Sequence, residues 1–305
     1  MSNPFQTFNA ENPPLQRFPQ QDPRQKSLKG WLLAISFGLA ALNFLLNPII
    51  EQPIRPFEAG KCWGFFCIGS MGGQAGILAI AAVMGPSSAL RRHLYVVPRF
   101  LSFVMAWLLG FMVSHAIHRD NFPPLKIVVG VLLVLPLLFC VCELPLWIFR
   151  TFLRWRIESP LDENTRPPQL SIAGILAATA AVGISLGAVR LGQKLSGISN
   201  EAEWWLGVAI AAAWCGGICV LVLPVVTAMV FRTQSLVVGL LVSVAWIGLL
   251  ITVLQIVVSS LVGGIPSSEL RLFGFMGLGF TITLLGPLFL VRHYGYRLRW
   301  GRSLN

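Results

Sequence analysis

The fold is decided by residues 205–231, which read WLGVAIAAAWCGGICVLVLPVVTAMVF. This stretch carries no charged side chain over its 27 residues. A helix needs only about 20 apolar residues to cross a bilayer. Because backbone groups in lipid must be hydrogen-bonded within their own segment, the segment is expected to be helical. Residues 205–231 therefore predict a transmembrane helix, which can bend at Pro224 to fit its unusual length.

Seven further apolar runs of similar length occupy most of the remaining chain. They are residues 31–50, 63–84, 100–117, 127–148, 171–189, 236–261 and 272–291. Only 11% of the 305 residues are charged, whereas a soluble domain carries roughly 25%. This composition excludes a soluble enzyme, a nucleic-acid-binding domain and a secreted disulfide scaffold. It predicts an all-α fold, a polytopic membrane helix bundle with eight transmembrane helices.

The basic residues predict the orientation of these spans. With eight spans, 16 of the 23 Lys and Arg residues lie on the side of the two termini and 7 on the other side. Because cytoplasmic loops carry the excess of Lys and Arg, both termini are expected in the cytoplasm of a cell (inner) membrane. Residues 1–30 then form a disordered cytoplasmic tail and residues 292–305 a basic cytoplasmic tail.

The net charge of +11 collects on the cytoplasmic face in this topology. The expected partners are therefore the lipid bilayer and anionic lipid heads on that face. The mixture of arginines and aromatic residues between positions 292 and 302 also has a nucleic-acid interpretation. Anchoring at the membrane interface explains the same residues, so no nucleic-acid partner is expected.

Similar segments recur at a nearly constant separation. Pro145 and Pro287, like Trp63 and Trp205, lie 142 residues apart, and Ala106-Trp107 precedes Ala245-Trp246 by 139. Residues 153–155 and 298–300 both read Leu-Arg-Trp. These matches predict two tandem four-helix halves, residues 31–150 and 171–291, joined by a cytoplasmic connector at 151–170. An even number of helices gives both halves the same orientation, so we expect a pseudo-twofold axis along the membrane normal.

Glu143 is the one acidic residue within a predicted span. An ionisable group inside a membrane is by default a candidate proton or cation site. A structural interpretation competes with this one. Glu143 lies near the cytoplasmic end of its span, where Arg150 or Arg154 on the same helix face could neutralise it.

A run of small residues surrounds a second polar candidate in the span 63–84. Gly69 with Gly73, and Gly72 with Gly76, form two small-xxx-small pairs that allow helices to approach closely. Gln74 lies among them near mid-depth, either as a hydrogen-bonding residue across a packing seam or as a polar station on a solute path. Gly73-Gln74 and the later Gly85-Pro86 resemble a pattern in uncharacterised bacterial multi-pass membrane proteins. The resemblance covers one hairpin and implies no activity.

Two functional hypotheses remain open at this point. The first is a transporter-like conduit for a small solute or ion, which the duplication and Glu143 favour. The alternative is a non-transporting membrane scaffold, sensor or assembly partner, which fits the scarcity of polar residues in the spans. No catalytic motif is recognisable, so an enzyme is not expected. Cys215 with Cys219, and His115 with His118, have spacings that suit a metal but lack a complete ligand set. We therefore expect no metal or cofactor.

Overall fold

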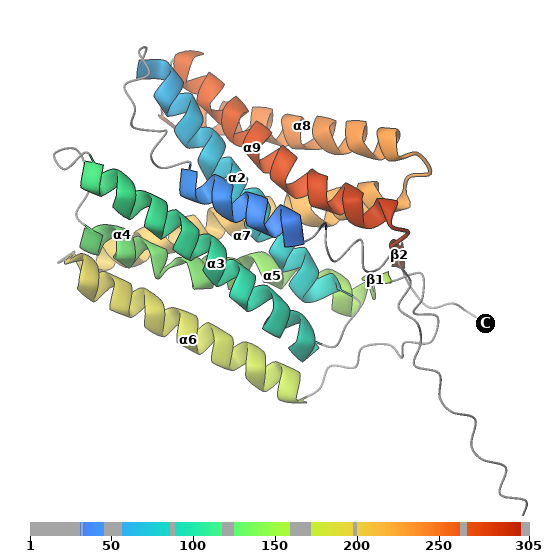
Figure 1. Ribbon diagram of the computed structural model, residues 1–305, viewed down its shortest axis with the longest axis horizontal. Helices are drawn as coiled ribbons and strands as arrows, with labels where there is room; N and C mark the ends of the chain where they lie inside the picture. The colour runs from blue at the N-terminus through green and yellow to red at the C-terminus, as the bar shows by residue number, and fades with distance from the viewer. Residues whose placement is uncertain are drawn as a thin grey trace, which may run out of the picture.

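The computed structural model describes residue 31 and residues 33–45, 57–85, 89–117, 125–158, 172–197, 200–262 and 267–299 (Figure 1). Nearly all of these residues are helical, which confirms the all-α prediction. The elements are a helix at Leu33–Leu45, α2 (Phe57–Met84), α3 (Ala89–Ile117), α4 (Leu125–Leu132), α5 (Leu135–Phe152), β1 (Arg156–Glu158), α6 (Ile172–Ser196), α7 (Glu201–Arg232), α8 (Leu236–Val262), α9 (Ser267–His293) and β2 (Arg297–Arg299).

Six stretches among the described residues are long and apolar enough to cross a membrane. They are Phe65–Met84, Arg91–Gly110, Val128–Phe152, Glu201–Arg232, Leu236–Val257 and Arg271–His293. The prediction of a helical multi-pass membrane protein is therefore confirmed by the length and composition of six helices. The helix Leu33–Leu45 and α6 overlap the two other predicted spans but are not among the six. The predicted tail 1–30, residues 159–170 of the connector and residues 300–305 lie outside the described residues.

The fourth predicted span, residues 127–148, is divided into two helices. α4 ends at Leu132, and α5 begins at Leu135 with Pro136 in its first turn. Proline has no backbone N–H, and its ring clashes with the carbonyl group four residues earlier, here that of Leu132. The chain turns between the two helices, where the Leu137 N–H donates to the Val134 carbonyl oxygen at 3.0 Å.

Four helices form the centre of the bundle. α2 packs most extensively on α9 and also on α5, and α5 packs on α7 (Figure 1). Residue numbers rise together along the α2–α9 contact, where Gly69 meets Met276 and Gly76 meets Leu284. These two helices therefore run in the same direction. The core between the four helices is apolar; its largest fully buried side chains include Ile80, Met84, Leu146, Leu223, Leu284 and Leu288.

α5 and α9 end in the same way. After each helix one residue has a positive φ angle, 56° at Arg154 and 87° at Gly295, and a short strand follows. β1 and β2 pair as an antiparallel ribbon with Ile157 opposite Leu298. Ile157 is buried in the core and Leu298 packs against it. The ribbon therefore joins the carboxyl ends of two central helices that are far apart in the sequence.

Candidate functional site

The glycine seam predicted in the span 63–84 packs on α9. A Cβ atom at Gly69 would overlap the Met276 carbonyl oxygen, and one at Gly73 would lie 2.6 Å from the Phe280 carbonyl oxygen. The Thr283 hydroxyl donates across the same contact to the Ser70 carbonyl oxygen at 3.1 Å. The two backbones are therefore in direct contact, which the absence of Cβ atoms permits.

The other two predicted seam residues have different surroundings. A Cβ at Gly76 would lie 2.9 Å from a methyl group of Leu223 on α7, whereas Gly72 is exposed and faces only the ring of Phe280. Gly76 thus brings α2 close to a third central helix. Gly72 lies at the edge of the α2–α9 contact.

Gln74 lies halfway along the apolar stretch of α2 and is buried with Asn43. The two side-chain amides form a reciprocal pair, because Asn43 Nδ2 donates to Gln74 Oε1 at 2.8 Å and Gln74 Nε2 donates to Asn43 Oδ1 at 3.0 Å. This is the hydrogen-bonding role that the sequence offered as one of two interpretations. Its partner lies on the helix Leu33–Leu45, and nothing in the sequence identified it.

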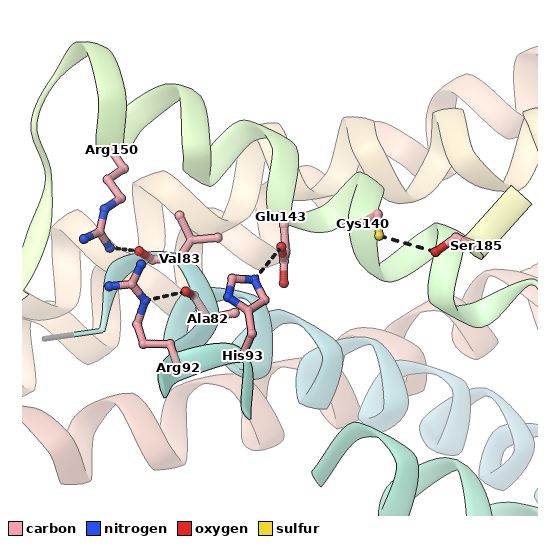
Figure 2. Close-up of polar contacts among 8 residues, drawn as sticks. All are labelled: Ala82, Val83, Arg92, His93, Cys140, Glu143, Arg150 and Ser185. Atoms are coloured by element: carbon pink, nitrogen blue, oxygen red, sulfur yellow. Dashed lines mark hydrogen bonds and ion pairs between the residues drawn. The ribbon is translucent and has the colours of Figure 1, made fainter. Parts of the chain in front are cut away.

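Glu143 packs against the first turns of α3 (Figure 2). Its Oε2 lies 3.5 Å from His93 Nε2, its side chain is only 12% exposed, and Arg92 interacts with it electrostatically. The Oε1 atom is buried and has no hydrogen-bond partner among the described residues. The carboxylate therefore lies beside His93 and Arg92, and one of its oxygens accepts no hydrogen bond from the described residues.

Arg150, one of the two partners expected for Glu143, is engaged elsewhere. Its Nη1 donates to the Val83 carbonyl oxygen at the end of α2. Arg92 binds the same helix end, with Nε donating to the Ala82 oxygen at 2.6 Å (Figure 2) and Nη1 to the Gly85 oxygen at 3.1 Å. Both guanidinium groups are buried. They satisfy carbonyl groups that have no partner within the helix, where the helix dipole also favours positive charge.

α7 ends in a similar arrangement. Arg292, near the end of α9, donates to the carbonyl oxygens of Val230 and Thr233 and to the Thr233 hydroxyl, the last at 2.9 Å. The Gln234 carbonyl oxygen accepts a further bond at 3.3 Å. An arginine from one central helix therefore binds the carboxyl end of another at two places in the bundle.

Sequence reasoning counted Arg92 only as a topology residue and gave no role to His93. The available signal was the short connection between the spans. α2 ends at Met84 and α3 begins at Ala89, so residues just after the connection must lie beside the end of α2. Arg91, Arg92 and Arg99 interrupt the apolar run, which is why the predicted span began only at residue 100.

All the cysteines are free thiols, and Cys142 of α5 shares a side-chain hydrogen bond with Cys219 of α7. Among the described residues, no three His, Cys, Asp or Glu side chains are grouped as a metal ligand set. The His115 side chain, His118 and Asp120 lie outside the described residues. Comparison of the chain with family models, with curated proteins and with solved structures finds no match in any of the three.

Proposed function

We propose that the protein is a non-transporting membrane scaffold or assembly partner. The observation that carries this proposal is the closed centre of the bundle. α2 and α9 touch through their backbones at Gly69 and Gly73. The inward-facing positions that follow, toward the carboxyl end of α2, are filled by apolar side chains. Gln74, the polar group nearest mid-depth on α2, has both ends of its amide hydrogen-bonded to Asn43. A conduit would need polar groups available to a solute, and this pair is already satisfied.

The proposed topology has eight spans. α5 and α7 run in the same direction, because Arg150 near the end of α5 binds the end of α2, and Arg292 near the end of α9 binds the end of α7. α2 and α9 are themselves parallel, so all four carboxyl ends lie at the same end of the bundle. The chain between them must therefore return along the whole bundle, and α6 is the described helix in that position (Figure 1). Its 25 residues extend about 37 Å at 1.5 Å per residue, enough to cross the hydrocarbon core. The helix Leu33–Leu45, which reaches Gln74 through Asn43, supplies the remaining span.

The proposed halves are related by a pseudo-twofold axis. When the two halves are exchanged, α2 takes the place of α7 and α5 takes the place of α9. The α2–α9 contact then becomes the α7–α5 contact, and both contacts are extensive. It also converts Arg150 on the end of α2 into Arg292 on the end of α7. Antiparallel pairing of β1 with β2 is what a twofold axis through the ribbon requires. The turns that follow α5 and α9 place Arg154 in the same position as Gly295. In this alignment Leu298 corresponds to Ile157, and not to Leu153 as the shared Leu-Arg-Trp sequence would suggest.

We place the carboxyl ends of α2, α5, α7 and α9 on the cytoplasmic side of an inner membrane. The excess of basic residues at these ends supports this orientation and anionic lipid heads as partners. A topology reporter fused after residue 305 is expected to give a cytoplasmic signal, and a reporter inserted at residues 198–199 an external one. A reversed result would overturn the orientation without affecting the scaffold proposal.

The native cysteines provide a direct test of the closed centre. Cys67, Cys142 and Cys219 are buried in the core, and we expect a small water-soluble thiosulfonate to leave them unmodified in vesicles. A Glu201→Cys variant, at the exposed beginning of α7, is the reactive control. Unfolding in detergent should make every thiol reactive. Modification of Cys142 or Cys219 in the folded protein would reveal a water path and overturn the proposal.

One observation favours the conduit as a second candidate. Glu143 Oε1 is buried without a described partner beside His93, as expected for a group that binds a transient proton or cation. Reconstituted vesicles would then show a proton- or cation-dependent flux that Glu143→Gln abolishes, since this change keeps the shape and removes the charge. Equal, background-level flux from both proteins and from empty vesicles would reject the conduit and retain the scaffold.

A further inference from the structure

The β1–β2 ribbon has one apolar face and one charged face. Side chains directly opposite each other in an antiparallel pair lie on the same face, so Ile157 and Leu298 share the inner face. The outer face then carries Arg156 opposite Arg299 and Glu158 opposite Arg297. The outer face therefore carries three arginines and one glutamate at the end of the membrane helices α5 and α9.

Glu158 cannot satisfy this set of arginines. It pairs with Arg156 and with Arg299, the latter through Nη1 and Oε2 at 3.1 Å. An ionised carboxylate offers about four acceptor sites, whereas the guanidinium groups of Arg297 and Arg299 alone present about ten N–H donors. Arg299 is 53% exposed and Arg297 is also exposed. The outer face thus keeps a surplus of positive charge and of hydrogen-bond donors.

A fourth arginine lies beside the ribbon at a conformational cost. Arg154 has a φ of 56°, a region that side chains with a Cβ atom rarely adopt, while Gly295 occupies the same place after α9. Glycine would suit both turns better. An exposed arginine held at a strained position points to a role for its side chain. No hydrogen bond or ion pair of the Arg154 guanidinium is found among the described residues.

We propose that the outer face of the β1–β2 ribbon, together with Arg154, binds the phosphate group of anionic membrane lipids. The guanidinium groups provide the paired donors that phosphate oxygens accept. The lipid is the favoured source of phosphate because the ribbon follows directly from two membrane helices, at the level where head groups lie. This inference names a site for the lipid partner in the proposed function and rests on the membrane placement proposed there.

The test compares lipids retained by the purified full-length protein. Protein in micelles is supplied with phosphatidylglycerol or phosphatidylcholine, and bound lipid is counted by native mass spectrometry. We expect phosphatidylglycerol to be preferred, and each of Arg154→Gly and Arg297→Gln to weaken its binding about fivefold, or about twenty-five-fold together. The matched control is the double variant Arg190→Gln with Lys194→Gln. It removes two exposed charges near the carboxyl end of α6, at the end of the bundle away from the ribbon, and should leave binding unchanged.

Four results would overturn the site. They are unchanged binding by the double ribbon variant, equal retention of phosphatidylcholine, an equal loss with the α6 control, and competition by soluble glycerol phosphate at concentrations matching the lipid. The melting temperature of Arg154→Gly supplies a further check. It should be no lower than that of the parent, since glycine suits this turn, and a large fall would indicate a structural role instead. Lipid retention is independent of thiol reactivity, so either proposal can fail alone.

Discussion

Replacement of Gly69 by alanine should weaken the protein at its most extensive helix contact. The added methyl group would overlap the Met276 carbonyl oxygen, and backbone atoms cannot move aside as a flexible side chain can. α2 and α9 must therefore separate. Overpacking of this kind costs about 1–3 kcal/mol, and loss of the Thr283–Ser70 hydrogen bond adds about 0.6 kcal/mol. The better helix propensity of alanine offsets about 1 kcal/mol of this cost, which leaves a net destabilisation of about 0.6–2.6 kcal/mol.

Gly207→Ala is the matched control, since the same change is made inside a long membrane helix. Gly207 is exposed on α7, and nothing lies within 4 Å of a Cβ built there. Only the propensity term applies, so this variant should be as stable as the parent or up to about 1 kcal/mol more stable. The free energy of unfolding is measured by titration from mild to denaturing detergent, with helix content followed by circular dichroism. Equal stability of the two variants would refute the backbone contact between α2 and α9.

Three further predictions concern the polar contacts of the bundle. Glu143→Gln should leave insertion and helix content unchanged, because His93 can still face a group of the same shape; loss of the folded protein in membranes would contradict this. Single and double alanine variants of Asn43 and Gln74 should show a coupling energy of about 0.6–1.7 kcal/mol, and additive effects would show that the pair is not formed. Arg150→Leu and Arg292→Leu should each destabilise the protein by about 1–3 kcal/mol by leaving carbonyl groups unpaired, whereas Arg190→Leu at the surface should change stability by less than about 0.5 kcal/mol.

The membrane helices could be predicted because apolar length is a property of each segment alone. Their bounds were less accurate where charge occurs within a helix. α3 begins at Ala89 and not at residue 100, because two of its arginines, Arg92 and Arg99, find local partners. Arg92 binds carbonyl groups of α2, and Arg99 lies over the Tyr95 ring at 3.2 Å. An arginine that is paired in this way can enter a helix that a charge-free window would exclude.

The partners of the candidate residues were harder to predict than the residues themselves. Gly69, Gly73 and Gln74 could be singled out from the sequence, and the structure places all three at helix contacts. Which helix each one meets depends on how the helices rotate and pack, and an apolar sequence carries little information about that. Glu143 shows the same limit, since the expected Arg150 binds α2 and the observed neighbour is His93.

The α2–α9 contact also fixes when the molecule can be completed during synthesis. Gly69 and Met276 touch across 207 residues of chain. At about 5–20 residues per second, a ribosome needs roughly 10–40 s to make that intervening chain. Throughout this interval α2 resides in the bilayer with its glycine face in contact with lipid or with a temporary neighbour. α9 is made long after α2 and completes the packing of α2, so a nascent chain that stops before α9 cannot reach the native bundle.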